Sequence, residues 1–138
     1  MTVLGTVAAL AVAISLPTAA GSPDAGELCK LKGTRYAGKT SQGKPICFTL
    51  TRAGKISEYA YGFADSCGSG TSRTTSKTGI PVGGTGSFST TFSGSFFKGK
   101  IGGQKASGTL RSKRRDYSTI PSSTCDSGLL RWNATRKR

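Results

Sequence analysis

The stretch YAGKTSQGKPICFTLTRAGKISEYAYGF, residues 36–63, decides the fold. Its apolar residues alternate with small or polar ones, and a period of two is typical of strands with one buried face. The alternation breaks at residues 43–45 and 53–54, where Gly and Pro or Ala and Gly favour tight turns. The stretch therefore predicts successive antiparallel strands, with Tyr36 and Phe48 in the core. The side chains expected at the exposed tip of the first hairpin are Ser41, Gln42 and Lys44.

The same alternation recurs to the end of the chain, and helical periodicity is absent after residue 20. A loop is expected over residues 68–79, and a basic loop after Leu110. The fold class predicted is all-β, an antiparallel meander of about seven or eight strands that forms a small barrel or a sandwich. The residues expected on the inner faces are Ile46, Phe48, Leu50, Tyr59, Tyr61, Phe63, Phe88, Thr90, Phe92, Phe97, Gly99, Ile101, Ala106, Gly108, Leu110, Leu130, Trp132 and Ala134.

The chain begins with an uncharged apolar run, residues 3–16, that is followed by Pro17 and small residues. The run is short of the roughly 20 residues that cross a bilayer, and it predicts the helix of a secretory signal peptide. No Lys or Arg precedes it, so either the true start lies upstream or the signal is weak; a cut near Ala25 and a buried N-terminal helix are alternatives. We expect cleavage after Ala20 and a secreted or extracellular protein, with association with the cell wall as one form of this. The divisions predicted are a signal peptide at 1–20, an N-terminal segment tied by Cys29 at 21–33, and a β domain at 34–138.

The four cysteines, Cys29, Cys47, Cys67 and Cys125, all follow the signal. An even number in an exported chain predicts two disulfides, and the lack of histidine and of closely paired cysteines disfavours a metal site. Cys47 is out of phase with the inner residues of its strand, whereas Cys67 is in phase with those of its own and should point inward. We therefore expect the pairs Cys29–Cys47 and Cys67–Cys125, the first pinning the N-terminal segment to the outside.

The charge is the strongest functional signal. The chain contains twenty Lys and Arg residues but only six Asp and Glu residues. The resulting net charge of +14 attracts polyanions. The expected partners are anionic cell-wall polymers, anionic lipid headgroups or free DNA; charge that serves only solubility is the alternative. Only Tyr117 lies beside the main cluster, so a sequence-specific nucleic-acid reader is not expected, and no amphipathic helix predicts membrane insertion after cleavage. The predicted polyanion-binding residues are Lys113, Arg114, Arg115, Arg136, Lys137 and Arg138.

Catalytic chemistry finds little support in the sequence. With no histidine, the acid–base candidates are Glu58, Asp65, Asp116 and Asp126. Asp65 is in phase with the inner aromatic residues of its strand, so one interpretation turns it inward with a raised pKa; the plainer one turns it to solvent or pairs it with an arginine. No serine has the setting of a nucleophile. We expect no enzyme, cofactor or metal.

Two further functions stay open. A small barrel can hold an apolar or carbohydrate ligand in its mouth, although the same aromatic side chains can simply fill the core. The residues concerned are Tyr59, Tyr61, Phe63, Phe88, Phe92 and Trp132. A secreted protease inhibitor that presents residues 71–78 as a loop is the other candidate.

Four segments carry a family resemblance: YAGKTSQGKPICFTL (36–50), GSFSTTFSG (86–94), KASGTLR (105–111) and CDSGLLRWNATR (125–136). They resemble uncharacterised small secreted actinobacterial β-domain proteins, whose pattern is Tyr-x-Gly-x-Thr-Ser-Gln-Gly, then Ser-Gly-Thr-Leu-Arg, then Cys-x-Ser-Gly-x-x-x-Trp-x-Ala. The resemblance covers residues 34–136. It implies an exported β-rich domain in which Cys67 and Cys125 are the recurrent pair, with Cys29 and Cys47 as an addition. It implies no catalytic residue.

Overall fold

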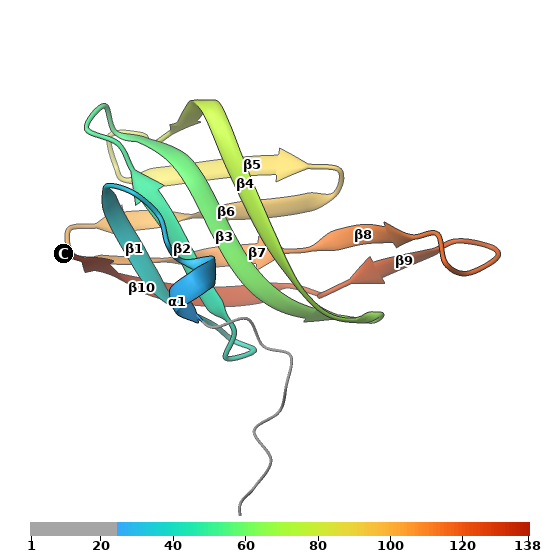
Figure 1. Ribbon diagram of the computed structural model, residues 1–138. Helices are drawn as coiled ribbons and strands as arrows, with labels where there is room; N and C mark the ends of the chain where they lie inside the picture. The colour runs from blue at the N-terminus through green and yellow to red at the C-terminus, as the bar shows by residue number, and fades with distance from the viewer. Residues whose placement is uncertain (1–24) are drawn as a thin grey trace, which may run out of the picture.

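The computed structural model describes residues 25–138, and almost all of its regular structure is β (Figure 1). The signal peptide predicted for residues 1–20 lies outside the described residues. The elements are α1 (Ala25–Leu28), β1 (Thr34–Thr40), β2 (Pro45–Leu50), β3 (Lys55–Asp65), β4 (Gly68–Pro81), β5 (Ser87–Phe92), β6 (Ser95–Gly102), β7 (Lys105–Arg111), β8 (Lys113–Asp116), β9 (Ser123–Asp126) and β10 (Leu130–Lys137).

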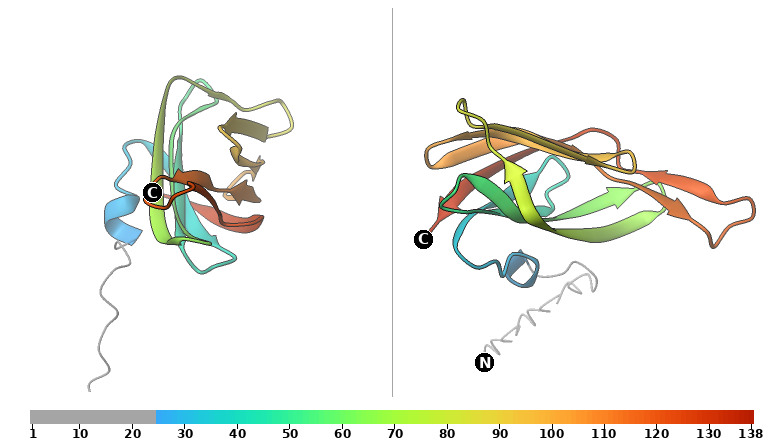
Figure 2. Two further views of the ribbon diagram at one scale, coloured as in Figure 1. Left: turned by 90° about the vertical axis from the view of Figure 1, so that its right-hand side faces the viewer. Right: turned by 90° about the horizontal axis from the view of Figure 1, so that it is seen from above.

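Eight strands form one antiparallel sheet in the order β4-β3-β2-β1-β10-β7-β6-β5. The sheet curls until it is nearly closed into a barrel, with β4 and β5 as its two edges (Figure 2). The remaining two strands, β8 and β9, form a separate hairpin that projects from the barrel as an arm (Figure 1). The predicted all-β antiparallel fold is confirmed.

The core lies between the curled faces of the sheet and is mainly aromatic. Phe48 and Phe97 are fully buried, and their ring centroids both lie close to Trp132, at 5.9 Å and 5.3 Å. Tyr36 is also buried, and its hydroxyl donates to the carbonyl of Gly103 at 2.6 Å. The predicted inner faces supply most of the core, but Ile56 and Ile80 were not predicted there, and the inward direction predicted for Phe92 is wrong because it is 77 % exposed at the edge strand β5. The members of the core are Tyr36, Ile46, Phe48, Ile56, Tyr59, Tyr61, Phe63, Ile80, Phe88, Phe97, Ala106, Leu110, Leu130, Trp132 and Ala134.

The disulfide Cys29–Cys47 is present as predicted and holds α1 on the outer face of the sheet. Cys47 does point outward, yet it is fully buried. The reason is that Leu28 and Leu31 pack over Cys47 and Ala60 and form a second, smaller apolar cluster on this face. The short N-terminal segment thus covers apolar surface that the barrel would otherwise expose.

The disulfide Cys67–Cys125 is also present, but the predicted inward direction of Cys67 is wrong. Strand β3 ends at Asp65, so Cys67 lies in the turn before β4 and is exposed. The bond ties that turn to β9 at the root of the arm. Two disulfides indicate an oxidising compartment, as outside the cell.

Two segments that were predicted as loops are strands. Residues 68–79 belong to β4, which pairs with β3 over most of its length, so the loop expected at 71–78 is not a free loop. The basic segment after Leu110 forms the β8–β9 hairpin. The exposed tip of the first hairpin is present, but Gln42 there accepts from the Ala64 amide and donates to the Ala64 carbonyl, both at 2.8 Å. Within residues 25–138, no helix is long and apolar enough to cross a membrane.

Candidate anion-binding surface

The structure places the two predicted basic clusters at opposite ends of β10. Lys113–Arg115 belongs to β8, in the arm, which lies next to the beginning of β10. Arg136–Arg138 lies where β10 ends, at the far end of the barrel (Figure 1). The clusters are therefore two separate sites, and each has to be judged by its own surroundings.

The arm cluster is partly occupied by structural contacts. Arg114 donates to both carboxylate oxygens of Asp65, from Nε at 2.7 Å and from Nη2 at 3.3 Å. Arg115 Nε donates to Ser122 Oγ at 3.0 Å across the hairpin. Of these three side chains, Lys113 alone has neither an ion pair nor a hydrogen bond among the described contacts.

The same pair settles the role of Asp65. The hydrogen bonds from Arg114 favour the ionised form and hold the pKa of Asp65 below its usual value, although burial opposes them. The raised pKa considered for Asp65 is therefore wrong, and the plainer interpretation, a pair with an arginine, is confirmed. Asp65 also lies near Cys67 and Cys125, but these sulfurs are bonded to each other and supply no thiolate to a metal ion.

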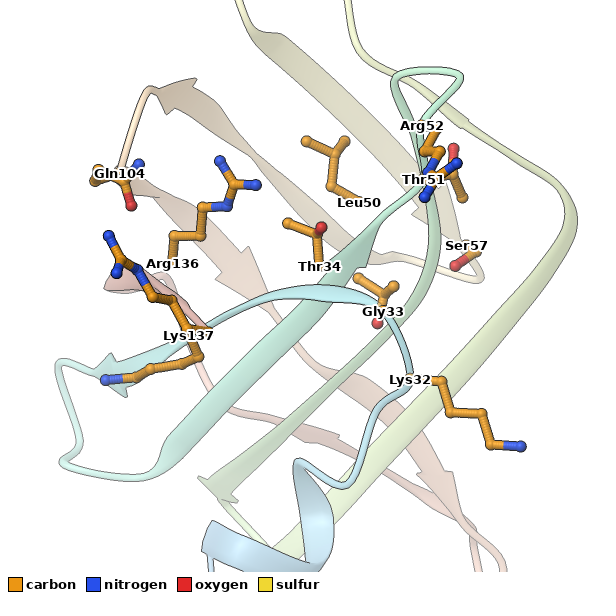
Figure 3. A pocket seen from close by; sticks show the side chains of 12 residues that line it. Lys32, Gly33, Thr34, Leu50, Thr51, Arg52, Ser57, Gln104, Arg136 and Lys137 are labelled. Atoms are coloured by element: carbon orange, nitrogen blue, oxygen red, sulfur yellow. The ribbon is translucent and has the colours of Figure 1, made fainter.

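At the other end of the barrel, residues from five chain segments surround a hollow of about 700 Å³ (Figure 3). The segments are the approach to β1, the end of β2 with its turn, the beginning of β3, the β6–β7 turn and the end of β10. We call this the basic hollow. Its lining residues are Lys32, Gly33, Thr34, Thr49, Leu50, Thr51, Arg52, Ser57, Gln104, Arg136, Lys137 and Arg138.

Backbone contacts fix the segments that form the basic hollow. The Thr51 hydroxyl accepts a hydrogen bond from the Lys55 amide at 3.2 Å, and the Thr51 amide donates to the Lys55 carbonyl at 2.8 Å. These two bonds close the β2–β3 turn. The amide of Arg136 donates to the Gln104 carbonyl at 2.8 Å, joining the end of β10 to the β6–β7 turn. Arg136 is in phase with the buried Trp132 and Ala134, so its side chain extends over the barrel end beside Gln104 and Leu50 (Figure 3).

The electrostatics of the basic hollow are one-sided. Five of its residues are cationic, none of its described lining residues is acidic, and none of the five cations forms an ion pair. The cations are Lys32, Arg52, Arg136, Lys137 and Arg138. One wall also contains Thr49. This residue is 6 % exposed, and its hydroxyl has no hydrogen-bond partner among the described residues. An unpartnered buried hydroxyl is costly, so a ligand oxygen at this wall would be favourable.

Positive charge continues onto the outer face of β1, β10, β7 and β6. No strand of the four contains Asp or Glu. The strand register places Lys39, Asn133, Ser107 and Lys100 in one row across all four strands. The exposed cations on this face are Lys39, Lys98, Lys100, Lys105, Arg131 and Lys137. A long polyanion could contact the basic hollow and this outer face together.

Of the residues that line the basic hollow, the sequence analysis predicted Arg136, Lys137 and Arg138 as anion-binding residues. It did not predict Lys32, Arg52 or Thr49. Nothing local marks these three, because the turns and the strand register bring them together from distant segments. The outer face did leave a signal. Lys98 and Lys100 are out of phase with Phe97 and Ile101, and this alternation places both lysines on one outward surface.

No family model, curated protein or solved structure matches the chain.

Proposed function

We propose that this protein is an exported, non-catalytic β domain that binds anionic polymers of the cell envelope or its surroundings. The observation that carries the proposal is the set of five cations around the basic hollow, without an acidic neighbour among the described lining residues. A cation that is already paired with a carboxylate must give up that ion pair to bind a new anion. These five cations have no ion pair to lose among the described residues.

The outer sheet face extends the contact in a way that suits a polymer. Each exposed ion pair contributes little, but a polyanion also releases counterions for every charge that is neutralised. The logarithm of affinity then falls with the logarithm of salt concentration, by about 0.7 to 0.9 per contact with nucleic acid. A binder of this kind holds its ligand through many weak contacts and needs no deep specific pocket.

The experiment is retention of the full chain on purified cell wall, on DNA and on vesicles of anionic lipid, over a salt series. The variant Arg52→Gln/Arg136→Gln/Lys137→Gln removes three cations of the basic hollow. The matched control, Lys30→Gln/Lys44→Gln/Lys77→Gln, removes the same charge outside the hollow and the basic outer face. We expect steep salt dependence on at least one polymer, and the hollow variant should lower the slope by about 2 to 3.

The control variant should retain most of the affinity. Equal losses in the two variants would mean that net charge alone attracts the polymer, and the assigned site would be wrong. Lack of retention on all three materials at about 50 mM salt would overturn the proposed function, since that is a range in which phosphate contacts hold strongly.

A further inference from the structure

The unclosed seam of the barrel is a second hollow with different chemistry. Strands β4 and β5 are the two edges of the sheet and do not pair with each other. A cleft of about 520 Å³ lies between them, bounded by residues of β3, β4, β5 and the root of the arm. This volume is within the range of ordinary small-ligand pockets. We call it the seam cleft.

One wall of the seam cleft is aromatic. Tyr59, Tyr61 and Phe63 follow one another along the inner face of β3. The rings of Tyr59 and Tyr61 are parallel, with centroids 6.4 Å apart and planes 6° from each other. Burial raises the pKa of the Tyr61 hydroxyl, although hydrogen bonding with Ser112 and Ser72 opposes this. These rings are held in place by the fold.

The adjoining wall consists of hydroxyl groups. Ser72, Thr74 and Ser76 alternate along β4 and are half-buried, where a filled barrel would carry large apolar side chains. Thr90 of β5 and Ser95 of β6 line the facing side. The cleft stays open because these side chains are too small to fill it, and it reaches β3 rings that remain largely buried in the core, each between 4 % and 8 % exposed.

The seam cleft is also lined by an exposed ring and by a lysine that forms no ion pair with the described residues, although it lies opposite Asp126 in the hairpin. Phe92, at the end of β5, is in phase with the buried Phe88, yet it is 77 % exposed. Lys113 is this lysine, whereas its neighbour Arg114 is committed to Asp65. None of the described lining residues is acidic.

We propose that the seam cleft binds a saccharide that bears a carboxylate, such as a uronic acid unit of an acidic glycan. The negative faces of aromatic rings attract the weakly positive C–H face of a sugar ring. Hydroxyl side chains match sugar hydroxyls better than an apolar ligand, although Ser76 and Ser95 already bond to the backbone of Gly79 and Lys113. Lys113 faces the carboxylate. This site is separate from the basic hollow and its binding does not depend on the proposed function.

The test is an amide NMR titration of the full chain with the trimer of galacturonic acid, at about 150 mM NaCl, where exposed charge contacts are screened beyond about 8 Å. The neutral trimer of N-acetylglucosamine and the fatty acid decanoate are the comparison ligands. We expect the acidic trimer to shift amides of β3, β4 and β5, and to bind more tightly than either comparison ligand.

Variants locate the contact. Phe92→Ala should weaken binding of the acidic trimer about fivefold, within the usual worth of an aromatic contact. Tyr117→Ala is the matched control, because Tyr117 is 80 % exposed but lies in the arm away from the cleft. Lys113→Gln should weaken the acidic trimer and leave the neutral trimer unchanged. The Arg52→Gln/Arg136→Gln/Lys137→Gln variant should bind the acidic trimer as before.

Three results would overturn the inference. One is the absence of shifts in β3–β5 with either saccharide, and another is tighter binding of decanoate at the same amides. The third is weaker binding of the acidic trimer in the basic-hollow variant together with unchanged binding in Phe92→Ala. That result would assign the binding of the trimer to charge alone. Loss of polymer retention with an intact seam cleft would contradict only the proposed function.

Discussion

At the scale of single residues, Gly99 and Gly108 explain how a large indole fits into a small barrel. The two glycines face each other on β6 and β7, and Trp132 is opposite Gly108 on β10. A Cβ added to Gly99 would lie 2.5 Å from the nearest indole carbon, and one added to Gly108 would lie 2.8 Å from it. Both positions thus require glycine because the ring occupies the space of a side chain.

Replacing Gly108 with alanine should therefore destabilise the protein. Overpacking of a well-filled core costs about 1–3 kcal/mol, and here the added atom also meets the backbone of Gly99 at 2.5 Å. Urea unfolding followed by Trp132 fluorescence would measure the loss. Gly102→Ala is the control, since a Cβ there meets nothing within 4 Å and the expected change is under about 0.5 kcal/mol. Equal stability of Gly108→Ala and the wild type would show that the indole does not lie over this glycine.

At the scale of elements, the arm is the feature whose attachment was least visible in the sequence. The pairing Cys67–Cys125 was predicted correctly, but by a strand phase that does not extend past Asp65. What the pattern could not supply is the end of β3: side chains beyond Asp65 lie in a turn, where they no longer alternate between the two faces of the sheet. Likewise, the many Ser, Thr and Gly residues of β4 are typical of a loop, and only pairing with β3 makes that segment a strand.

A charged contact at the root of the arm makes the stability of the fold depend on pH. Arg111 donates to both oxygens of Asp126, at 2.9 Å and 2.6 Å, and the amide of Gly128 donates to Asp126 Oδ1 at 2.8 Å. These bonds, led by the one from Arg111, lower the pKa of Asp126 to about 2. A carboxyl whose pKa is lower in the folded chain stabilises the fold above its unfolded pKa, near 4. That contribution is lost as the pH falls from about 4 to 2.

Asp126→Asn should therefore be less stable than the wild type at pH 6, with a difference that shrinks as the pH falls through this window. Denaturant unfolding at pH 6, 4, 3 and 2 would follow the difference, and carboxyl-carbon NMR would give the pKa of Asp126 directly. Glu27→Gln serves as control because Glu27 forms no ion pair among the described residues. Titration of Asp126 near 4, or a difference that is constant with pH, would contradict the contact.

At the scale of the whole molecule, the basic hollow shows what a sequence pattern leaves out. Alternation predicts which face of a strand is buried, and it did so for nearly every core residue, because burial is repeated locally along each strand. The hollow is built from single residues such as Lys32, Arg52 and Arg136, which no repeat connects. The net charge predicts an affinity for anions, and only the closure of the sheet decides where the unpaired cations lie.

The net charge of +14 also makes the folded chain repel itself. Raising NaCl from about 10 mM to 150 mM shortens the screening length from about 30 Å to 8 Å, so the urea midpoint should rise. A polyanion that binds the folded state should raise the urea midpoint further at far lower concentration, by mass action.

The hollow variant Arg52→Gln/Arg136→Gln/Lys137→Gln and the control Lys30→Gln/Lys44→Gln/Lys77→Gln carry the same net charge, so their NaCl responses should match. Their responses to polyphosphate should differ, with the hollow variant losing most of the gain. If the two variants respond alike to polyphosphate as well, the stabilisation comes from overall charge and the basic hollow has no special part in it.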